Sequence, residues 1–250
     1  GTGALHPARY HRGLLVAVEK AGAILLPETP VTGIAREGSG FAVSTPNGAV
    51  EARDVIVATN GYTDGALPWH RRRIVPIESA VIITEPVKGD ILSQVLPGGR
   101  TMTDSKINMY SARLTPDGRR LQFMSNRGLL VRDMRAKAAE MQRTMGRVFP
   151  QLAAVRAEYG WTGRMGFSFD RVPHLGARDG VHYAMGFCGA GMPMGTWLGH
   201  IIARRVLGEK DAATAFDDIP FESRPLYRGR PWFLPLVVRA YNARDGIDLR

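Results

Sequence analysis

A short apolar run, a glycine-rich turn and a helical pattern follow one another over residues 182–208, and this stretch constrains the fold most. The apolar run, 182–185, predicts a strand, and a helix is expected from about Pro193 to Leu207. The last turn of that helix is basic and is followed by Gly208, as helix ends often are. The turn between strand and helix is rich in glycine: Gly186, Gly189 and Gly191, with Gly195 just beyond.

A glycine turn that leads into a helix exposes backbone N–H groups that have no partner within the helix, and the helix dipole lies behind them. Such donors suit a phosphate or a planar ligand with electron-rich carbonyl oxygens. The glycines are not in the G-x-G-x-x-G order, so a plain tight turn remains the alternative interpretation.

Composition limits the kinds of protein that this chain can be. It has 250 residues, of which 44% are hydrophobic, which is enough for one large domain or two interleaved ones. Its single cysteine, Cys188, excludes an internal disulfide and a cysteine-based zinc site, and we expect no metal. No apolar run approaches the roughly 18 residues of a membrane span, and no signal peptide is visible. We therefore expect a cytoplasmic protein without a membrane partner.

The formal net charge is +10, and the densest basic cluster is Arg71–Arg73. One interpretation is a nucleic-acid or membrane partner, which predicts steep salt dependence. The other is a solvated surface with some attraction for an anionic ligand. We favour the second, because the arginines are scattered and do not alternate with aromatic residues as stacking platforms do.

The first third of the chain reads as an α/β layer that binds a ligand at the carboxyl end of a strand. A helix is expected over 7–21 and a short buried strand over 23–26. The apolar run 54–58 predicts a strand covered on both faces. Further strands are expected over 31–36, 41–45 and 48–52, the last two as a hairpin.

The pattern from Ile74 onward predicts an antiparallel sheet. Strands 108–114 and 120–124 are expected to pair across the turn 115–118. A methionine-rich stripe in the expected helix 132–149 indicates core packing and not a site. Other elements are expected as strands over 74–77 and 79–84 and as a final helix over 236–243.

Four stretches, in the same order, resemble the FAD-dependent oxidoreductases of the D-amino-acid-oxidase type, which include glycine, sarcosine and gamma-glutamylputrescine oxidases. They are Leu5-His6-Pro7 with the helix after it, 30–62, 161–176, and the turn 186–192. The gamma-glutamylputrescine oxidase branch looks most similar. The resemblance implies an α/β (α+β) fold in which an incomplete FAD/NAD(P)-binding layer is interleaved with an antiparallel-sheet substrate domain.

The resemblance also implies domain boundaries. Residues 1–73 and 156–215 would form the FAD-binding part, 74–155 the substrate domain, and 216–250 a C-terminal tail. The family's G-x-G-x-x-G segment, which cradles the FAD pyrophosphate, does not occur near Gly1. We therefore expect a missing N-terminal segment or a partner chain to supply it.

The resemblance implies a non-covalent FAD. Relatives that attach FAD through a cysteine place it near Gly163, which is glycine here. Val31 would lie against the adenine and Ala58 and Thr59 near the nucleotide half. The turn would donate N–H groups to the flavin pyrimidine edge and stabilise its developing negative charge. The residues of the turn expected to contact the flavin are Gly186, Phe187, Gly189, Ala190, Gly191 and Met192.

Three positions depart from the pattern of the family, the first of them by comparison with its sarcosine-oxidase members. Pro193 stands where they have a carboxylate-binding lysine, which argues for an amine or a longer substrate. Ala190 replaces the family histidine of the turn. Cys188 is interpreted as a small buried residue in preference to a redox group.

The candidate catalytic residues are Lys106, Tyr110 and Arg113 on the substrate sheet, although a solvated loop lysine is the plainer interpretation of Lys106. The expected function is oxidation of a C–N bond of an amine or amino acid to an imine, by hydride transfer to flavin. The alternative is an inactive fragment or a partner-dependent subunit that acts as an interaction module.

Overall fold

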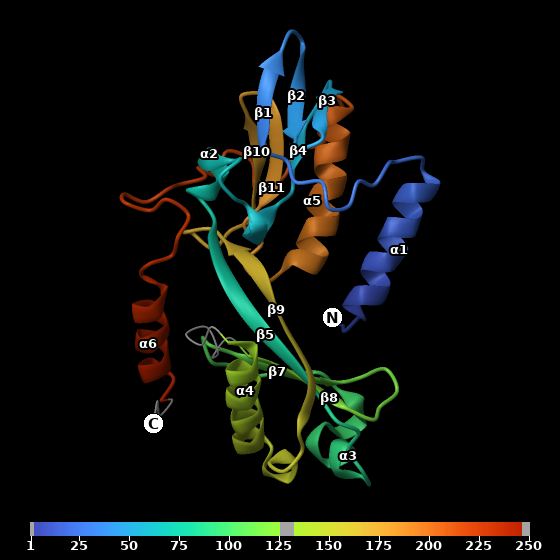
Figure 1. Cartoon of the computed structure of the whole chain (residues 1–250), viewed down its shortest axis with the longest axis vertical. Coiled ribbons are helices and arrows are strands. Elements are labelled where there is room, and N and C mark those ends of the chain that lie inside the picture. Colours follow the sequence, from blue (N-terminus) through green and yellow to red (C-terminus); the bar gives the residue numbers. More distant parts are fainter. Residues whose placement is uncertain (1–2, 126–132, 247–250) are drawn as a thin grey trace. The chain divides into compact units, whose positions relative to one another are not determined.

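The computed structural model describes residues 3–125 and 133–246, which form two units (Figure 1). Unit 1 contains the chain up to Pro76 together with Gly166–Arg230, and unit 2 contains Ile77–Met165 together with the segment from Pro231. The three boundaries expected from the sequence stay a prediction. No helix in the described part of the chain is both long enough and apolar enough to span a lipid bilayer.

Unit 1 contains two small sheets and the helices α1, α2 and α5. The strands β1, β2 and β3 form an antiparallel meander, which confirms the expected hairpin. The second sheet has the order β10-β11-β4, with β11 and β4 parallel. The bounds are α1 Pro7–Lys20, β1 Gly33–Glu37, β2 Gly40–Thr45, β3 Gly48–Ala52, β4 Ile56–Val57, η1 Asn60–Tyr62, α2 Pro68–Arg71, β10 His174–Arg178, β11 Val181–Met185 and α5 Gly191–Val206.

Helix α1 has the expected boundaries and physical reasons for them. Pro7 occupies the first turn, where a missing N–H costs nothing, and the His6 ring accepts a hydrogen bond from the N–H of Arg9. Gly22, at φ +87°, follows its end. None of its residues is buried, although its apolar side chains recur at helical spacing.

Two strand expectations in unit 1 are wrong. Residues 23–26 form no strand, and Ile24 is 84% exposed. A strand needs a neighbour that takes up its backbone N–H and C=O groups, and no described strand pairs with this run. The expected strand 54–58 shrinks to β4, in which Val57 is buried but Ile56 is 48% exposed. Because Ile56 and Val57 point to opposite faces, the face that carries Ile56 is not covered.

Unit 2 is built on a five-stranded sheet of order β6-β7-β8-β5-β9. Strands β7 and β8 pair antiparallel as expected, while the two expected strands after Ile74 are one continuous strand, β5. The bounds are β5 Val75–Thr84, α3 Ile91–Val95, η2 Pro97–Gly99, β6 Met102–Thr103, β7 Tyr110–Leu114, β8 Leu121–Ser125, α4 Met134–Val148, η4 Pro150–Leu152, β9 Ala157–Phe167 and α6 Leu234–Arg244.

Helix α4 lies against this sheet and closes the core of unit 2 (Figure 1). The Asp133 carboxylate caps it by accepting the N–H of Ala136. Met141 and Met145 are buried against Phe123, Leu121 and their neighbours, which confirms that the methionine stripe belongs to the core.

The core of unit 1 has two parts. On one side, α5 packs Leu198 and Ile202 against the β10–β11 hairpin. On the other, Phe221 from the proline-rich segment after Phe216 packs with Tyr183 of β11. The Tyr227 hydroxyl donates to the carbonyl of Ile74 at 2.7 Å and fixes that segment to unit 1.

Candidate functional site

The parallel pair β4 and β11 places two predicted cofactor segments at one edge of a sheet. Ile56 and Val57 pair with His182 and Tyr183, so both strands end in the same direction. Ala58 and Thr59 therefore lie at the same edge as Gly186, and both are exposed. Carboxyl ends of parallel strands are the usual place for ligands in α/β sheets.

The turn after β11 has a backbone that few sequences could adopt. Gly186, Cys188 and Gly189 have φ angles of +76°, +52° and +98°. A Cβ on Gly189 would meet nothing within 4 Å, so glycine is needed there for its backbone angle and not for space. The N–H of Ala190 closes the turn onto the carbonyl of Phe187 at 2.8 Å.

Some N–H groups of the turn bond inward and others do not. Gly186 donates to Oδ1 of Asn60, and Cys188 donates to the carbonyl of Gly166, both at 3.0 Å. Among the described residues, the N–H groups of Gly189, Gly191 and Met192 have no acceptor, and Gly189 and Gly191 are exposed. Helix α5 begins at Gly191, so its dipole lies behind these donors.

This donor set fits the pyrimidine edge of a flavin. Three outward N–H groups, with no side chain on two of the three residues, suit an acceptor that gains negative charge. Of the other members of the predicted turn, Phe187 forms an isolated bridge with Phe167, and Ala190 is the residue that precedes α5.

Sequence reasoning missed the residues that fix the turn from behind. Asn60 and Gly166 hold its inward N–H groups, and the thiol of Cys188 donates to the carbonyl of Gly186 at 3.0 Å. Ser168 Oγ lies 3.5 Å from the same sulfur. The dipeptide Asn60-Gly61, shortly after the apolar run that contains β4, was the available signal, since asparagine adopts left-handed backbone angles more readily than most residues.

The remaining predicted cofactor residues lie elsewhere. Val31 precedes β1 in unit 1 and is 39% exposed. Gly163 lies on β9 in unit 2, where it is half-buried. Their contacts with FAD stay a prediction.

Unit 2 does not bring the three catalytic candidates together. Tyr110 and Arg113 alternate on β7, so they point to opposite faces of the sheet. Tyr110 is buried in the core beside Phe123, whereas Arg113 donates to Oε1 of Gln122 at 3.0 and 3.2 Å. Lys106 places Nζ 5.0 Å from the centroid of the Tyr110 ring and 3.8 Å from a carboxylate oxygen of Asp104.

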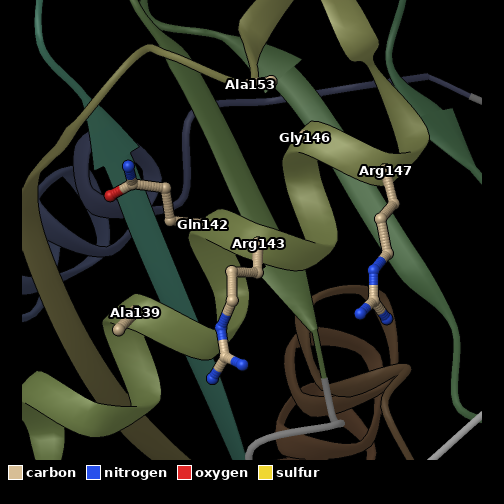
Figure 2. A pocket seen from close by; sticks show the side chains of 6 residues that line it. All are labelled: Ala139, Gln142, Arg143, Gly146, Arg147 and Ala153. Atoms are coloured by element: carbon tan, nitrogen blue, oxygen red, sulfur yellow. The ribbon is translucent and has the colours of Figure 1, made fainter. Parts of the chain in front are cut away.

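A hollow of about 540 Å³ lies on the outer side of α4 (Figure 2). Arg143 and Arg147 extend from the helix beside it, and Arg143 forms an ion pair with Glu140 at 2.7 Å. Its lining residues are Ala139, Gln142, Arg143, Gly146, Arg147 and Ala153. None of the predicted site residues lines this hollow, and the exposed arginines are its main polar groups, so it is the weaker candidate.

Unit 1 also buries an aromatic cluster that includes titratable rings. His70 lies 5.0 Å from Trp69 and 5.2 Å from Tyr183 between ring centroids, and only 5% of it is exposed. Burial, and secondly the charge of Arg73, lowers the pKa of His70 to about 4. Burial likewise raises the pKa of Tyr183. Both groups are therefore neutral near pH 7, as an apolar cluster requires.

Comparison with known proteins decides the family. The family model described as FAD dependent oxidoreductase matches residues 1–205. The chain belongs to this family. The same family was inferred above from four short stretches, and the match confirms that inference.

The similarity to curated relatives is consistent with this family membership. A probable oxidoreductase OrdL of Haemophilus influenzae is 32% identical over 92% of this chain and 53% of its own length. The gamma-glutamylputrescine oxidoreductase of Escherichia coli is 28% identical over 99% of this chain and 58% of its own length. The chain thus spans a little over half the length of these curated relatives.

A solved structure supports the fold. The glycine oxidase of Geobacillus kaustophilus has a TM-score of 0.64 at 19% identity, and the match covers 86% of this chain and 56% of that one. The mixed α/β fold with antiparallel sheets is therefore shared with this glycine oxidase.

Proposed function

We propose that the protein containing this chain is an FAD-dependent oxidoreductase that oxidises a C–N bond of an amine or amino acid to an imine. The observation that carries the proposal is the set of outward N–H groups of Gly189, Gly191 and Met192 at the start of α5. Membership of the FAD dependent oxidoreductase family supports it.

The chain's own residues would orient the cofactor and stabilise charge. A bound FAD would supply the chemistry, because it accepts a hydride from the carbon that bears the amine. The N–H groups of Gly189, Gly191 and Met192 would donate to the flavin, with the positive end of the α5 dipole behind them. Ala58 and Thr59, at the same sheet edge, would approach the nucleotide half. The FAD would be non-covalent, since Gly163 offers no side chain for attachment.

Two points bear on the substrate. One relative is a gamma-glutamylputrescine oxidoreductase, and structural neighbours include a glycine oxidase and an L-proline dehydrogenase. Pro193 stands where sarcosine-oxidase relatives have a carboxylate-binding lysine, by the resemblance described above. We therefore place gamma-glutamylated amines ahead of small amino acids such as glycine. On the substrate sheet, Arg113 and Lys106 are the proposed charged groups near the substrate.

The test uses the protein at its natural length, purified from its own host. We expect a yellow protein that releases FAD on acid precipitation and whose flavin bleaches anaerobically with gamma-glutamylputrescine faster than with glycine or proline. A colourless protein that takes up no added FAD would contradict the function, and equal bleaching by glycine would contradict only the substrate order.

The turn itself is tested by Gly189→Ala. An alanine at φ +98° costs about 1–3 kcal/mol of backbone strain. This strain favours a relaxed turn whose N–H groups no longer point at the flavin, so we expect FAD affinity to fall about tenfold or more. Gly199→Ala is the matched control, because Gly199 lies on the exposed face of α5 with no neighbour within 4 Å of an added Cβ. Equal FAD affinity in the two variants would exclude the turn as the flavin site.

One observation favours the second function, a partner-dependent subunit. Ile24 and Leu26 are 84% and 61% exposed beside a helix, α1, that buries nothing. Backbone exchange of residues 14–26 would then be fast in this chain alone and slow in its complex with a partner chain, while added FAD would leave the spectrum unchanged.

A further inference from the structure

Asn60 bridges the ends of the two parallel strands at the predicted flavin edge. It lies three residues beyond Val57, the last residue of β4, and its backbone is left-handed at φ +43°. Its side-chain Oδ1 accepts the N–H of Gly186, the first residue after β11, at 3.0 Å. One amide oxygen therefore ties β4 to the start of the glycine turn.

Gly166 makes room for this bridge. A Cβ at position 166 would lie 2.2 Å from Oδ1 of Asn60 and 2.9 Å from the N of Gly61, which no real side chain allows. The carbonyl of Gly166 in turn accepts the N–H of Cys188 at 3.0 Å. The turn is thus held at two alternate N–H groups by Asn60 and Gly166.

These two bonds decide which N–H groups face outward. With Gly186 and Cys188 bonded inward and Ala190 bonded to Phe187, the donors left among the described residues of the turn are Gly189, Gly191 and Met192, together with Phe187 at the bridge to Phe167. Gly186 is buried, so without Asn60 its N–H would have to find another acceptor by rearranging the turn.

We propose that Asn60 is a positioning residue, which holds the turn 186–192 in its donor-presenting form by accepting the N–H of Gly186. The inference rests on the proposed function in that the flavin is the ligand of those donors. Asn60 itself acts on flavin binding only through the conformation of the turn.

Two properties of Asn60 must be separated by the experiment. Asparagine supplies an acceptor, and it also adopts left-handed backbone angles at low cost. Asn60→Gly keeps the backbone freedom and removes the acceptor. Asn60→Asp keeps an acceptor of the same shape. Asn47→Gly, at the exposed tip of the β2–β3 hairpin, is the matched control.

The first readout needs no cofactor: hydrogen exchange of the Gly186 backbone N–H, followed by NMR in this chain. We expect exchange to become about tenfold or more faster in Asn60→Gly, and to stay slow in Asn60→Asp and Asn47→Gly. Exchange as slow in Asn60→Gly as in the wild type would overturn the proposal. So would equally fast exchange in Asn60→Asp, since the acceptor would then not be what matters.

The second readout uses the natural-length protein with FAD. In Asn60→Gly, we expect about tenfold weaker FAD binding and a more negative flavin reduction potential, because misplaced donors stabilise the reduced form less. The aspartate variant is left out of this arm, since its charge would itself shift the potential. An unchanged potential and affinity in Asn60→Gly overturns the positioning role while the enzyme function stands. A wild-type protein that binds no FAD overturns the function instead, and the exchange readout still decides whether Asn60 holds the turn.

Discussion

Helices α1 and α4 have nearly the same length and the same kind of apolar spacing, yet of the two only α4 has buried residues. α4 covers the sheet of unit 2 and buries Met141 and Met145 (Figure 1). α1 has no buried residue, and one of its few tertiary bonds is that between the hydroxyls of Tyr10 and Thr196, at 2.7 Å. An amphipathic pattern therefore specifies a helix and a face, but it does not specify what covers that face.

The same difference separates two apolar runs that both look like strands. The run 79–84 lies within β5, between β8 and β9, and buries Ile82 completely. The run 23–26 pairs with no described strand and leaves Ile24 exposed. Pairing partners, and not strand propensity, decide the outcome.

The largest expected effect lies in the core of unit 2. Phe123 is fully buried beside Tyr110 and Phe149, so Phe123→Ala should lower the free energy of unfolding by about 3–5 kcal/mol. Urea unfolding measures this loss, and Phe123→Leu, which leaves a smaller cavity, should lose less. A loss below about 1 kcal/mol for the alanine variant would mean that this core is loosely packed.

An intermediate effect is expected in the aromatic cluster of unit 1. His70 is buried in its neutral form with its pKa lowered to about 4, whereas a histidine in the unfolded chain has an ordinary pKa of about 6.5. The unfolded state therefore binds more protons, and stability should fall by about 3 kcal/mol as the pH drops from 6.5 to 4.

The measurement is urea unfolding across that pH range. His70→Phe, which keeps an aromatic ring, should flatten the pH dependence between 6.5 and 4. His200→Phe, a substitution of the same kind at an exposed site on α5, should leave the pH dependence of stability unchanged. If His70→Phe keeps the wild-type slope, another group carries the acid sensitivity.

The smallest effect is expected on α1. Leu14 is 41% exposed, so Leu14→Ala should change the free energy of unfolding of this chain by no more than about 0.5 kcal/mol. Urea unfolding beside Phe123→Ala makes the comparison direct. A loss close to that of the core variant would show that α1 packs against apolar surface in solution and would remove the contrast between the two helices.

Local signals predicted much of the fold. The ends of α1 follow from Pro7 and Gly22, the β7–β8 hairpin from its Pro-Asp-Gly turn, and the core face of α4 from its methionines. Each depends on residues close together in the chain, whose spacing can be read directly. Helix α5 begins at Gly191, two residues earlier than expected, because glycines hide the start of a helical pattern.

The candidate site was predicted only in part. The glycine turn and the edge at Ala58 and Thr59 were found, because a strand, a turn and a helix start leave a local pattern. Asn60 and Gly166 were missed, because their bonds to Gly186 and Cys188 join distant parts of the sequence. Tyr110 and Arg113 were grouped by closeness along β7, although their odd separation places them on opposite faces.

The family, most of the helices and hairpins, and the glycine turn with its free backbone donors could all be inferred from the order of the residues alone. These depend on short-range sterics and capping, which act within a few residues. The three-dimensional fold was needed to show which apolar faces are covered, which strand lies at an edge, and which amide oxygen accepts the Gly186 N–H. Those outcomes depend on contacts between segments far apart in the chain, and no local spacing records them.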